Sequence, residues 1–187
     1  AFRILTYLTS LGYLFKDKAD KVLNFSGGTH HGRSSFASGF CFLNDCILSI
    51  LKAIEHGFKN ILYIDIDAHH CDAVQDHFKN HDKVQIISVH EQNRWPKTGN
   101  ISDCVYNNLL NIPVPENLND SEMKFILNHL ILPYSKKINP DLTIVQAGTD
   151  CLKSDPQSKM SLSNNVYWFV LSKLKNLSKK TLILGGG

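Results

Sequence analysis

The stretch from Ile61 to His70, ILYIDIDAHH, places apolar, strand-forming residues directly before carboxylates and imidazoles. Alternate side chains of a strand share a face, so Asp65, Asp67 and His69 are expected on one side of it. Buried carboxylates are costly unless they are paired or bind a cation. The stretch therefore predicts a metal site at the carboxyl end of a buried strand. The alternative is that the strand ends early and leaves Asp67 and His69 in a solvated loop.

Strand-like segments alternate with segments of helical periodicity along the whole chain. The predicted strands cover residues 21–25, 59–66, 84–89, 109–114, 142–147 and 181–184. The predicted helices cover about residues 2–14, 43–56, 72–79, 119–137 and 166–174. This alternation predicts a three-layer α/β/α fold, with a mainly parallel sheet, right-handed crossovers and helices on both faces. Pro113 places the 109–114 strand at the periphery of the sheet.

Ligands of such sheets bind beyond the carboxyl ends of the strands, where chemically active residues gather in this chain. These are His30 and His31, Asp67 and His69, the segment from His90 to Trp95, Asp150, and the final glycines. Asp67, His69 and Asp150 would supply two oxygens and one nitrogen and leave a position open for water, which is typical of catalytic sites. Zn²⁺ is favoured, although two carboxylates also suit Fe²⁺.

The adjacent His30 and His31 follow a strand in a glycine-containing loop. Imidazoles titrate near neutral pH, so the two suit the roles of general base and general acid. Each needs a carboxylate to fix its tautomer, and Asp65 and Asp72 are the candidates. The other histidines are expected to be surface residues (His56, His77, His81 and His129) or to have no assigned role (His90).

These motifs resemble those of the zinc-dependent histone deacetylases, most closely the class I members. The matching segments, in order, are SGGTHH (26–31), SGFCFLND (38–45), IDIDAHH (64–70) with Asp72, GTD (148–150) with Asp155-Pro156, and LILGGG (182–187). They span essentially all of the chain. The resemblance implies the arginase/deacetylase-like fold and a hydrolase that converts Nε-acetyl-lysine to lysine and acetate.

The resemblance also implies a role for each matched residue. Asp67, His69 and Asp150 match the zinc ligands. His30 and His31 match the tandem catalytic histidines, with Asp65 as the partner of His30 and Asp72 as the partner of His31. The family's structural K⁺ would be held by backbone carbonyls around Asp65, Asp67, His69, Ser88 and Val89.

Four further residues match the wall of the family's acyl-lysine tunnel, namely Gly39, Phe40, Cys41 and Trp95. The two aromatic faces would enclose the aliphatic stem of the lysine through dispersion and apolar burial. Phe40 and Trp95 would equally fit the commoner fate of core or interface aromatics. Cys41 is expected to be a small wall residue rather than a nucleophile.

Composition narrows the class of protein. With 187 residues, 43% of them hydrophobic and 20% charged, the chain is expected to form one soluble globular domain. A net charge of +3 without a long basic run gives no support for nucleic-acid binding, and no apolar run is long enough for a membrane span. The five cysteines lack a C-x-x-C pair and are expected to be free thiols.

The resemblance implies partners and a location as well. Acetylated histone tails or other acetyl-lysine proteins would be the substrates, and corepressor proteins would be partners. The protein would then regulate chromatin and transcription in the nucleus, and also act in the cytoplasm.

The sequence departs from the family in two respects. Cys71 and Ala73 replace glycines, so the loop that carries Asp72 would be strained if either position requires a positive φ. Residues 1–187 are also expected to be a partial catalytic domain, truncated at both ends. The family's catalytic tyrosine would follow Gly187, and a substrate-binding aspartate would precede Ala1. Such a fragment is expected to bind metal but to turn over poorly.

Two alternatives remain at this stage. One is an amidohydrolase of the same fold that acts on acetylated polyamines or small metabolites. The other is a catalytically impaired, deacetylase-like scaffold that binds proteins.

Overall fold

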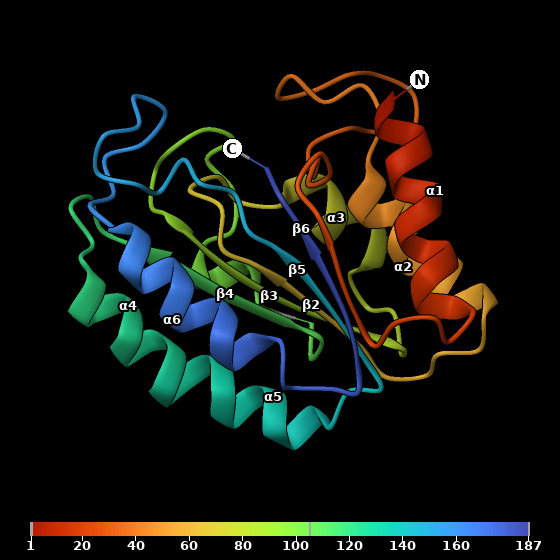
Figure 1. The fold of residues 1–187 in the computed structure, drawn as a ribbon. Helices are drawn as coiled ribbons and strands as arrows, with labels where there is room; N and C mark the ends of the chain where they lie inside the picture. Colours follow the sequence, from red (N-terminus) through yellow and green to blue (C-terminus); the bar gives the residue numbers. More distant parts are fainter. Residues whose placement is uncertain (1, 105, 187) are drawn as a thin grey trace.

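The computed structural model describes residues 2–104 and 106–186, so Ala1 and Gly187 lie outside the described residues (Figure 1). Six strands form one sheet: β1 (Lys21–Asn24), β2 (Ile61–Asp65), β3 (Val84–Glu91), β4 (Leu109–Val114), β5 (Leu142–Gln146) and β6 (Lys180–Leu184). Their order is β1-β6-β5-β2-β3-β4, and each pair of neighbours is parallel. The predicted parallel sheet is confirmed, and β4, which contains Pro113, lies at its edge as expected.

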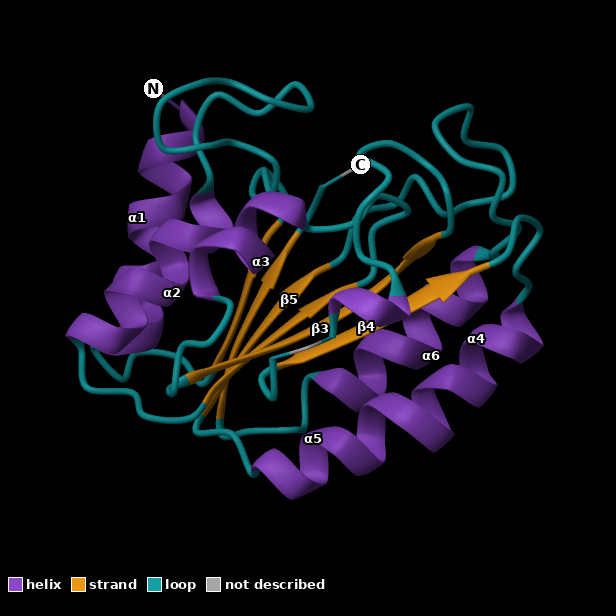
Figure 2. Cartoon of the chain, turned by 180° about the vertical axis from the view of Figure 1, so that it is seen from behind, coloured by secondary structure: helices purple, strands orange, loops and turns teal. Residues whose placement is uncertain are grey.

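Helices cover both faces of this sheet, which gives the three layers that the sequence predicts (Figures 1 and 2). One layer contains α1 (Phe2–Phe15), α2 (Asp45–Glu55) and α3 (Asp72–Phe78). The opposite layer contains α4 (Asp120–Ile126), the π-helical η2 (Leu127–Ile131), α5 (Leu132–Ile138) and α6 (Asn164–Leu174). A short 3-10 turn, η1 (Ile101–Asp103), precedes β4. None of the described helices is long and apolar enough to cross a bilayer.

Strand β2 shows how the sheet divides the core. Leu62 and Ile64 pack into the cluster that includes α4 and α6, whereas Ile61 and Tyr63 pack into the cluster beneath α1, α2 and α3. Every residue of β2 is buried. Burial on both faces explains why this central strand is almost continuously apolar, and each such side chain contributes about 1.5–3 kcal/mol to folding.

The predicted helix over residues 119–137 is present but is not uniform. Asn119 caps its start, where its side chain accepts the N–H groups of Ser121 and Glu122. Its middle turn is π-helical, and Leu132 donates to the carbonyl of Leu127, five residues earlier. Pro133 follows immediately and has no N–H to donate, so the regular hydrogen-bond ladder is interrupted there.

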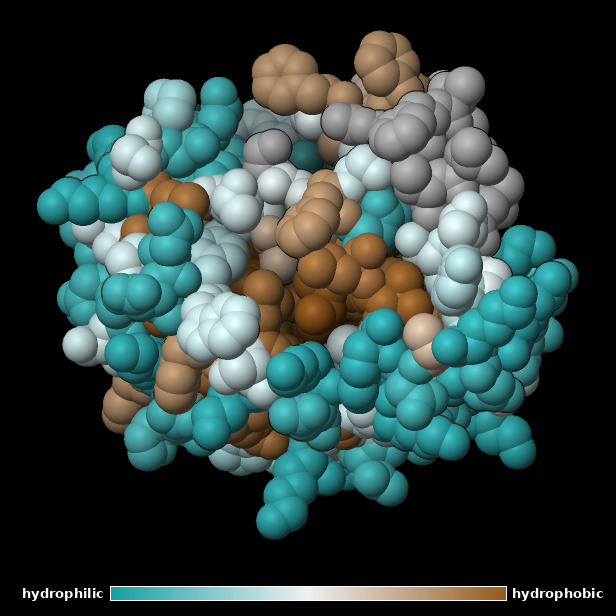
Figure 3. Space-filling view, viewed as in Figure 1, coloured by the Kyte–Doolittle hydropathy of each residue, from teal (hydrophilic) through white to brown (hydrophobic). Residues whose placement is uncertain are grey.

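The outer strand β1 leaves part of the sheet uncovered. Leu23 is exposed on it, and Ile183 of the neighbouring β6 is only partly buried. Figure 3 shows an apolar area in the middle of the face on which Figure 1 draws β1 and β6, with hydrophilic side chains below it. The five cysteines are free thiols, as predicted.

Candidate active site

Asp67, His69 and Asp150 come together beyond the carboxyl ends of β2 and β5. One ligand atom of each lies within 4.8 Å of the others. The Nδ1 atom of His69 lies 2.8 Å from Asp150 Oδ2 and 3.1 Å from Asp67 Oδ1. Strand β2 ends at Asp65, yet Asp67 is buried, so the alternative of a solvated loop is wrong for this residue. The structure thus brings the three predicted ligands together, and their role in binding a metal stays a prediction.

The charges in this cluster favour a cation. Burial, together with the neighbouring Asp67 carboxylate, raises the pKa of Asp150 to about 6. Burial alone would lower the pKa of His69, but hydrogen bonds to Asp150 and Asp67 outweigh it and raise that pKa to about 9. Two buried carboxylates beside one imidazole therefore favour positive charge between them, and this donor set fits Zn²⁺.

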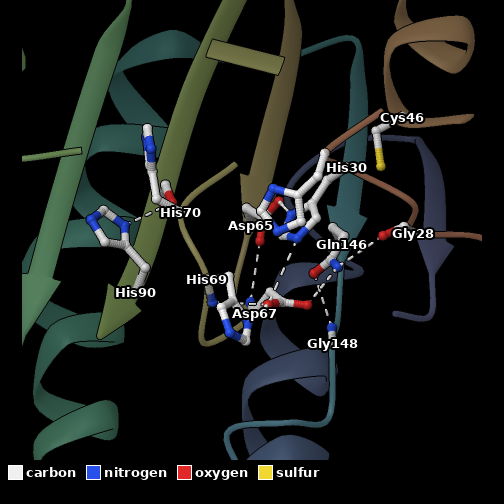
Figure 4. Close-up of polar contacts among 12 residues, drawn as sticks. Gly28, His30, Cys46, Asp65, Asp67, His69, His70, His90, Gln146 and Gly148 are labelled. Carbon is white, nitrogen blue, oxygen red and sulfur yellow. Dashed lines mark hydrogen bonds and ion pairs between the residues drawn. The ribbon is translucent and has the colours of Figure 1, made fainter. Parts of the chain in front are cut away.

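Hydrogen bonds from neighbouring groups orient the Asp67 and Asp150 carboxylates, and Figure 4 shows the one between Gln146 and Asp67. The Nε2 group of Gln146 donates to Asp67 Oδ2 at 2.9 Å, and the backbone N–H of Ala68 donates to Asp150 Oδ1 at 2.9 Å. Gly148 lies directly against Asp67, because a Cβ atom at this position would be 2.0 Å from Asp67 Oδ2. Any larger residue at this position would displace the Asp67 side chain.

His30 and His31 lie next to this cluster, and each is bonded to the carboxylate predicted for it. His30 Nδ1 is 2.8 Å from Asp65 Oδ2, and His31 Nδ1 is 2.7 Å from Asp72 Oδ1. The Nε2 atom of His30 lies 3.7 Å from Asp67 Oδ1. Each carboxylate thereby keeps a hydrogen on Nδ1 of its histidine, so proton exchange by a neutral ring takes place at Nε2.

The two histidines have pKa values that move in opposite directions. Burial would lower the pKa of His30, but the Asp65 and Asp67 carboxylates raise it to about 10. Burial lowers the pKa of His31, and the hydrogen bond that its ring donates to Asp72 does not fully offset this effect. The environment therefore favours a charged His30 beside a neutral His31.

The partners of these histidines are themselves held in place. Asp65 accepts the hydroxyl of Tyr63 at 2.5 Å, and Asp72 pairs with Arg33 at 2.5 Å. Asn44, the N-cap of α2, donates to the carbonyl of His30 at 2.9 Å. Asp45 accepts the N–H groups of Gly28 and Thr29, so the first residue of α2 shapes the same loop.

Sequence reasoning did not assign roles to the supporting residues Arg33, Asn44, Asp45, Tyr63 and Gln146. A signal was present for Gln146, because it is a polar residue at the end of a mostly apolar, fully buried strand. The Arg33 contact carried no such signal, since it depends on where the loop of Arg33 meets the first turns of α3.

The replacement of two family glycines does not strain the loop of Asp72. Cys71 has φ of −74° and caps α3, whose first two residues are Asp72 and Ala73. Neither Cys71 nor Ala73 has positive φ. The expected rearrangement is therefore absent from this loop, and the substitutions give no support to an impaired scaffold.

A pocket of about 860 Å³ is lined by the three predicted metal ligands and by the histidine pair. Gly39, Phe40, Cys41 and Trp95 all line it, as predicted for tunnel residues. The ring of Trp95 lies 4.6 Å from that of His31 and 6.2 Å from that of His69, measured between centroids. Phe40 lines the same pocket but is 96% exposed, so enclosure of a lysine stem by the two aromatic rings stays a prediction.

The remaining predictions have mixed outcomes. His56, His77 and His129 are exposed and His81 is partly buried, whereas His90 is buried and bonded on both nitrogens, to Ser88 and to the carbonyl of Gly99. The predicted K⁺ site involves the backbone carbonyls around Asp65 and Ser88. These two residues lie side by side in paired strands, but the binding of K⁺ there stays a prediction.

Sequence comparison with known proteins identifies relatives of this chain. The histone deacetylase domain matches residues 6–187. Histone deacetylase 8 of Xenopus laevis is 33% identical over 96% of this chain and 57% of its own length. Histone deacetylase 6 of Arabidopsis thaliana is 34% identical, and type-1 histone deacetylase 1 of Dictyostelium discoideum is 33% identical. The chain spans 38% and 35% of the lengths of these two relatives. With its parallel sheet, its paired histidines and this match over nearly its whole length, the chain belongs to the histone deacetylase family.

Proposed function

We propose that this protein hydrolyses Nε-acetyl-lysine in proteins, with Zn²⁺ as its cofactor. The observation that carries the proposal is the convergence of Asp67, His69 and Asp150 in the same pocket as the carboxylate-bonded His30 and His31. The first three residues would hold the ion. When bound, Zn²⁺ polarises the amide carbonyl and lowers the pKa of the attacking water.

The protein's own residues would manage the protons. His31 is neutral at pH 7 because burial lowers its pKa, so its Nε2 can accept a proton from water and return it to the leaving amine. His30 stays protonated between Asp65 and Asp67, and its charge would stabilise the oxyanion that forms on the substrate.

The pocket also supports an acyl-lysine side chain as the substrate. Phe40, Trp95 and Pro156 provide apolar wall, which suits the aliphatic stem of lysine. Acetylated histone tails are the substrates that the family name suggests, and other acetyl-lysine proteins share the reacting group. Action on histones would place the protein in the nucleus, with corepressor partners, and we offer both as parts of the same proposal.

Mass spectrometry of an acetyl-lysine peptide incubated with the zinc-loaded protein tests this function. We expect release of acetate and free lysine, and loss of that release in Asp150→Asn. Acetylputrescine, offered in parallel, distinguishes a polyamine amidohydrolase. Equal turnover by wild type and Asp150→Asn would contradict the proposal, and metal binding without turnover of either substrate would favour a binding scaffold.

The family's catalytic tyrosine, which would donate a hydrogen bond to the oxyanion of the reacting amide, would come from outside the described pocket. No tyrosine is among the described residues that line it. A polypeptide of residues 1–187 should therefore bind metal yet turn over about 10²–10³ times more slowly than a longer chain that supplies such a donor. Equal kcat values for the two polypeptides would refute this part of the proposal.

A further inference from the structure

Glu91 and Arg94 form an ion pair at the rim of the pocket, beside Trp95. Glu91 is the last residue of β3, and 6% of its side chain is exposed, against 22% for Arg94. The Nε atom of Arg94 lies 2.8 Å from Glu91 Oε2, and its NH2 group donates to Oε1 at 2.9 Å. The NH2 group thus makes the one hydrogen bond of this pair, and Nε is a close charge contact without hydrogen-bond geometry; together they hold the two side chains against each other.

The same pair fastens a second loop of the pocket. The NH1 group of Arg94 donates to the carbonyl of Gln157 at 2.7 Å, and Glu91 Oε2 accepts the N–H of Lys159 at 2.7 Å. Gln157 lies in the loop that follows Asp150, and both Arg94 and Gln157 line the pocket. The pair therefore joins two walls that are 63 residues apart in the sequence.

The backbone of Glu91 connects this pair to the candidate metal site. Its N–H donates to the carbonyl of Ala68 at 2.9 Å, and the N–H of Ala68 donates to Asp150 Oδ1 at 2.9 Å. Ala68 stands between Asp67 and His69 in the chain. The rim and the floor of the pocket are thus parts of one hydrogen-bonded unit.

Trp95 needs a restraint of this kind. It is 46% exposed, and its ring contacts are with His31 and His69. Asn93 and Lys97, on either side of it, have φ of +62° and +64°, a conformation that residues other than glycine rarely adopt. Trp95 is only partly buried, and the backbone conformation on either side of it is unfavourable, so neither fixes its position firmly. The ion pair beside it therefore provides the stronger constraint.

We propose that Glu91 and Arg94 are positioning residues that hold Trp95 and the 156–157 wall at the spacing that accepts an acetyl-lysine side chain. The identity of that side chain rests on the proposed function, but the restraint on Trp95 belongs to the fold itself. Neither residue belongs to the proton-transfer pair or to the three metal ligands. Loss of the pair therefore raises KM and relaxes acyl-chain selectivity, and leaves kcat and its pH profile unchanged.

Fluorescence quenching tests the restraint without any need for activity. The chain contains two tryptophans, and Trp168 is exposed on α6, so a Trp168→Phe background leaves Trp95 as the sole reporter. We expect acrylamide to quench Trp95 faster in Arg94→Gln. Quenching should be intermediate in Arg94→Lys, which keeps the positive charge but has one nitrogen in place of the three of the guanidinium group. Arg94→Lys also provides the readout if Arg94→Gln does not fold. Unchanged quenching in a folded variant overturns the proposal.

The matched control removes an exposed ion pair from the same loop. Lys159 and Glu116 are 2.8 Å apart at the surface, with more than half of each side chain exposed, so Glu116→Gln should leave quenching unchanged. Faster quenching in Glu116→Gln would show that any perturbation of this loop frees Trp95, and would overturn the specific role of Arg94.

Kinetics then tests positioning. With an acetyl-lysine peptide, Arg94→Gln should raise KM by about tenfold at an unchanged kcat, and should raise the relative turnover of a butyryl-lysine peptide. A fall in kcat at unchanged KM would overturn the positioning role. Absence of all turnover in the wild-type protein would count against the proposed function alone, because the quenching result stands independently.

Discussion

His30 and His31 are adjacent in the chain, with ring centroids 4.0 Å apart, yet their surroundings favour opposite charge states. His30 faces two carboxylates that raise its pKa to about 10, whereas burial lowers the pKa of His31. One pair of like residues thereby provides a fixed positive charge and a neutral base. The charge on His30 depends on Asp65 and Asp67, whereas Asp72 bonds to the His31 ring and only partly offsets the effect of burial on its pKa.

Asp72→Asn should lower kcat by on the order of 10–100-fold, because the carboxylate that fixes the Nδ1–H tautomer of His31 is lost. Steady-state deacetylation of an acetyl-lysine peptide measures this effect, and the zinc content should stay at the wild-type value. Asp76→Asn is the matched control, since Asp76 is the other partner of Arg33 and lies at the surface. An equal loss of kcat in Asp76→Asn would attribute the effect to Arg33 instead.

Gly148→Ala should weaken metal binding without removing a ligand. The new Cβ would lie 2.0 Å from Asp67 Oδ2, so the carboxylate has to leave the position in which its Oδ1 contacts His69. We expect zinc affinity to fall by on the order of 10–100-fold, as measured by metal analysis after dialysis against a competing chelator. Gly12→Ala is the control, because nothing lies within 4 Å of a Cβ there. Wild-type zinc retention in Gly148→Ala would show that the site tolerates this shift.

Asn108→Ala should destabilise the fold. The Nδ2 group of buried Asn108 donates to the carbonyls of Phe78 and Val84 at 2.8 and 2.9 Å, and its Oδ1 accepts the N–H of Asn80. Truncation leaves these buried groups unpaired, so the free energy of unfolding should fall by about 2–3 kcal/mol in urea titrations. The exposed neighbour offers a control, and Asn107→Ala should change stability by less than about 0.5 kcal/mol. Similar losses in both variants would rule out a specific role for Asn108.

His90 should make the protein less stable in acid. Burial, together with the neighbouring His70, lowers its pKa to about 3, whereas an unfolded histidine titrates near 6.5. The unfolded state therefore binds the additional proton between these values, and the stability present above pH 6.5 is lost as the pH falls toward 3.

Urea unfolding at pH 7 and pH 5 measures this linkage. Wild type should lose about 2 kcal/mol more than His90→Gln between pH 7 and pH 5. His129→Gln replaces an exposed histidine and should follow wild type. Identical acid dependence in wild type and His90→Gln would show that His90 does not carry this linkage.

Much of the fold could be predicted from local sequence, because each strand and helix has its own apolar period and is bounded by turn or capping residues. The six strands lie within one or two residues of their predicted bounds, and Pro113 correctly placed 109–114 at an edge. The π-helical turn before Pro133 was not predicted, since the exact hydrogen-bond pattern of a helix leaves little trace in its period.

The amino-acid sequence by itself determined the alternation of strands and helices, and with it the sheet edge at which Asp67, His69, Asp150 and the histidine pair would gather. Only the tertiary structure decided which groups support them. Gln146 reaches Asp67 across 79 residues of sequence, and Arg94 reaches Gln157 across 63. Periodicity reports the face of an element on which a side chain lies, but a hydrogen bond between two loops depends on where both loops pass in space.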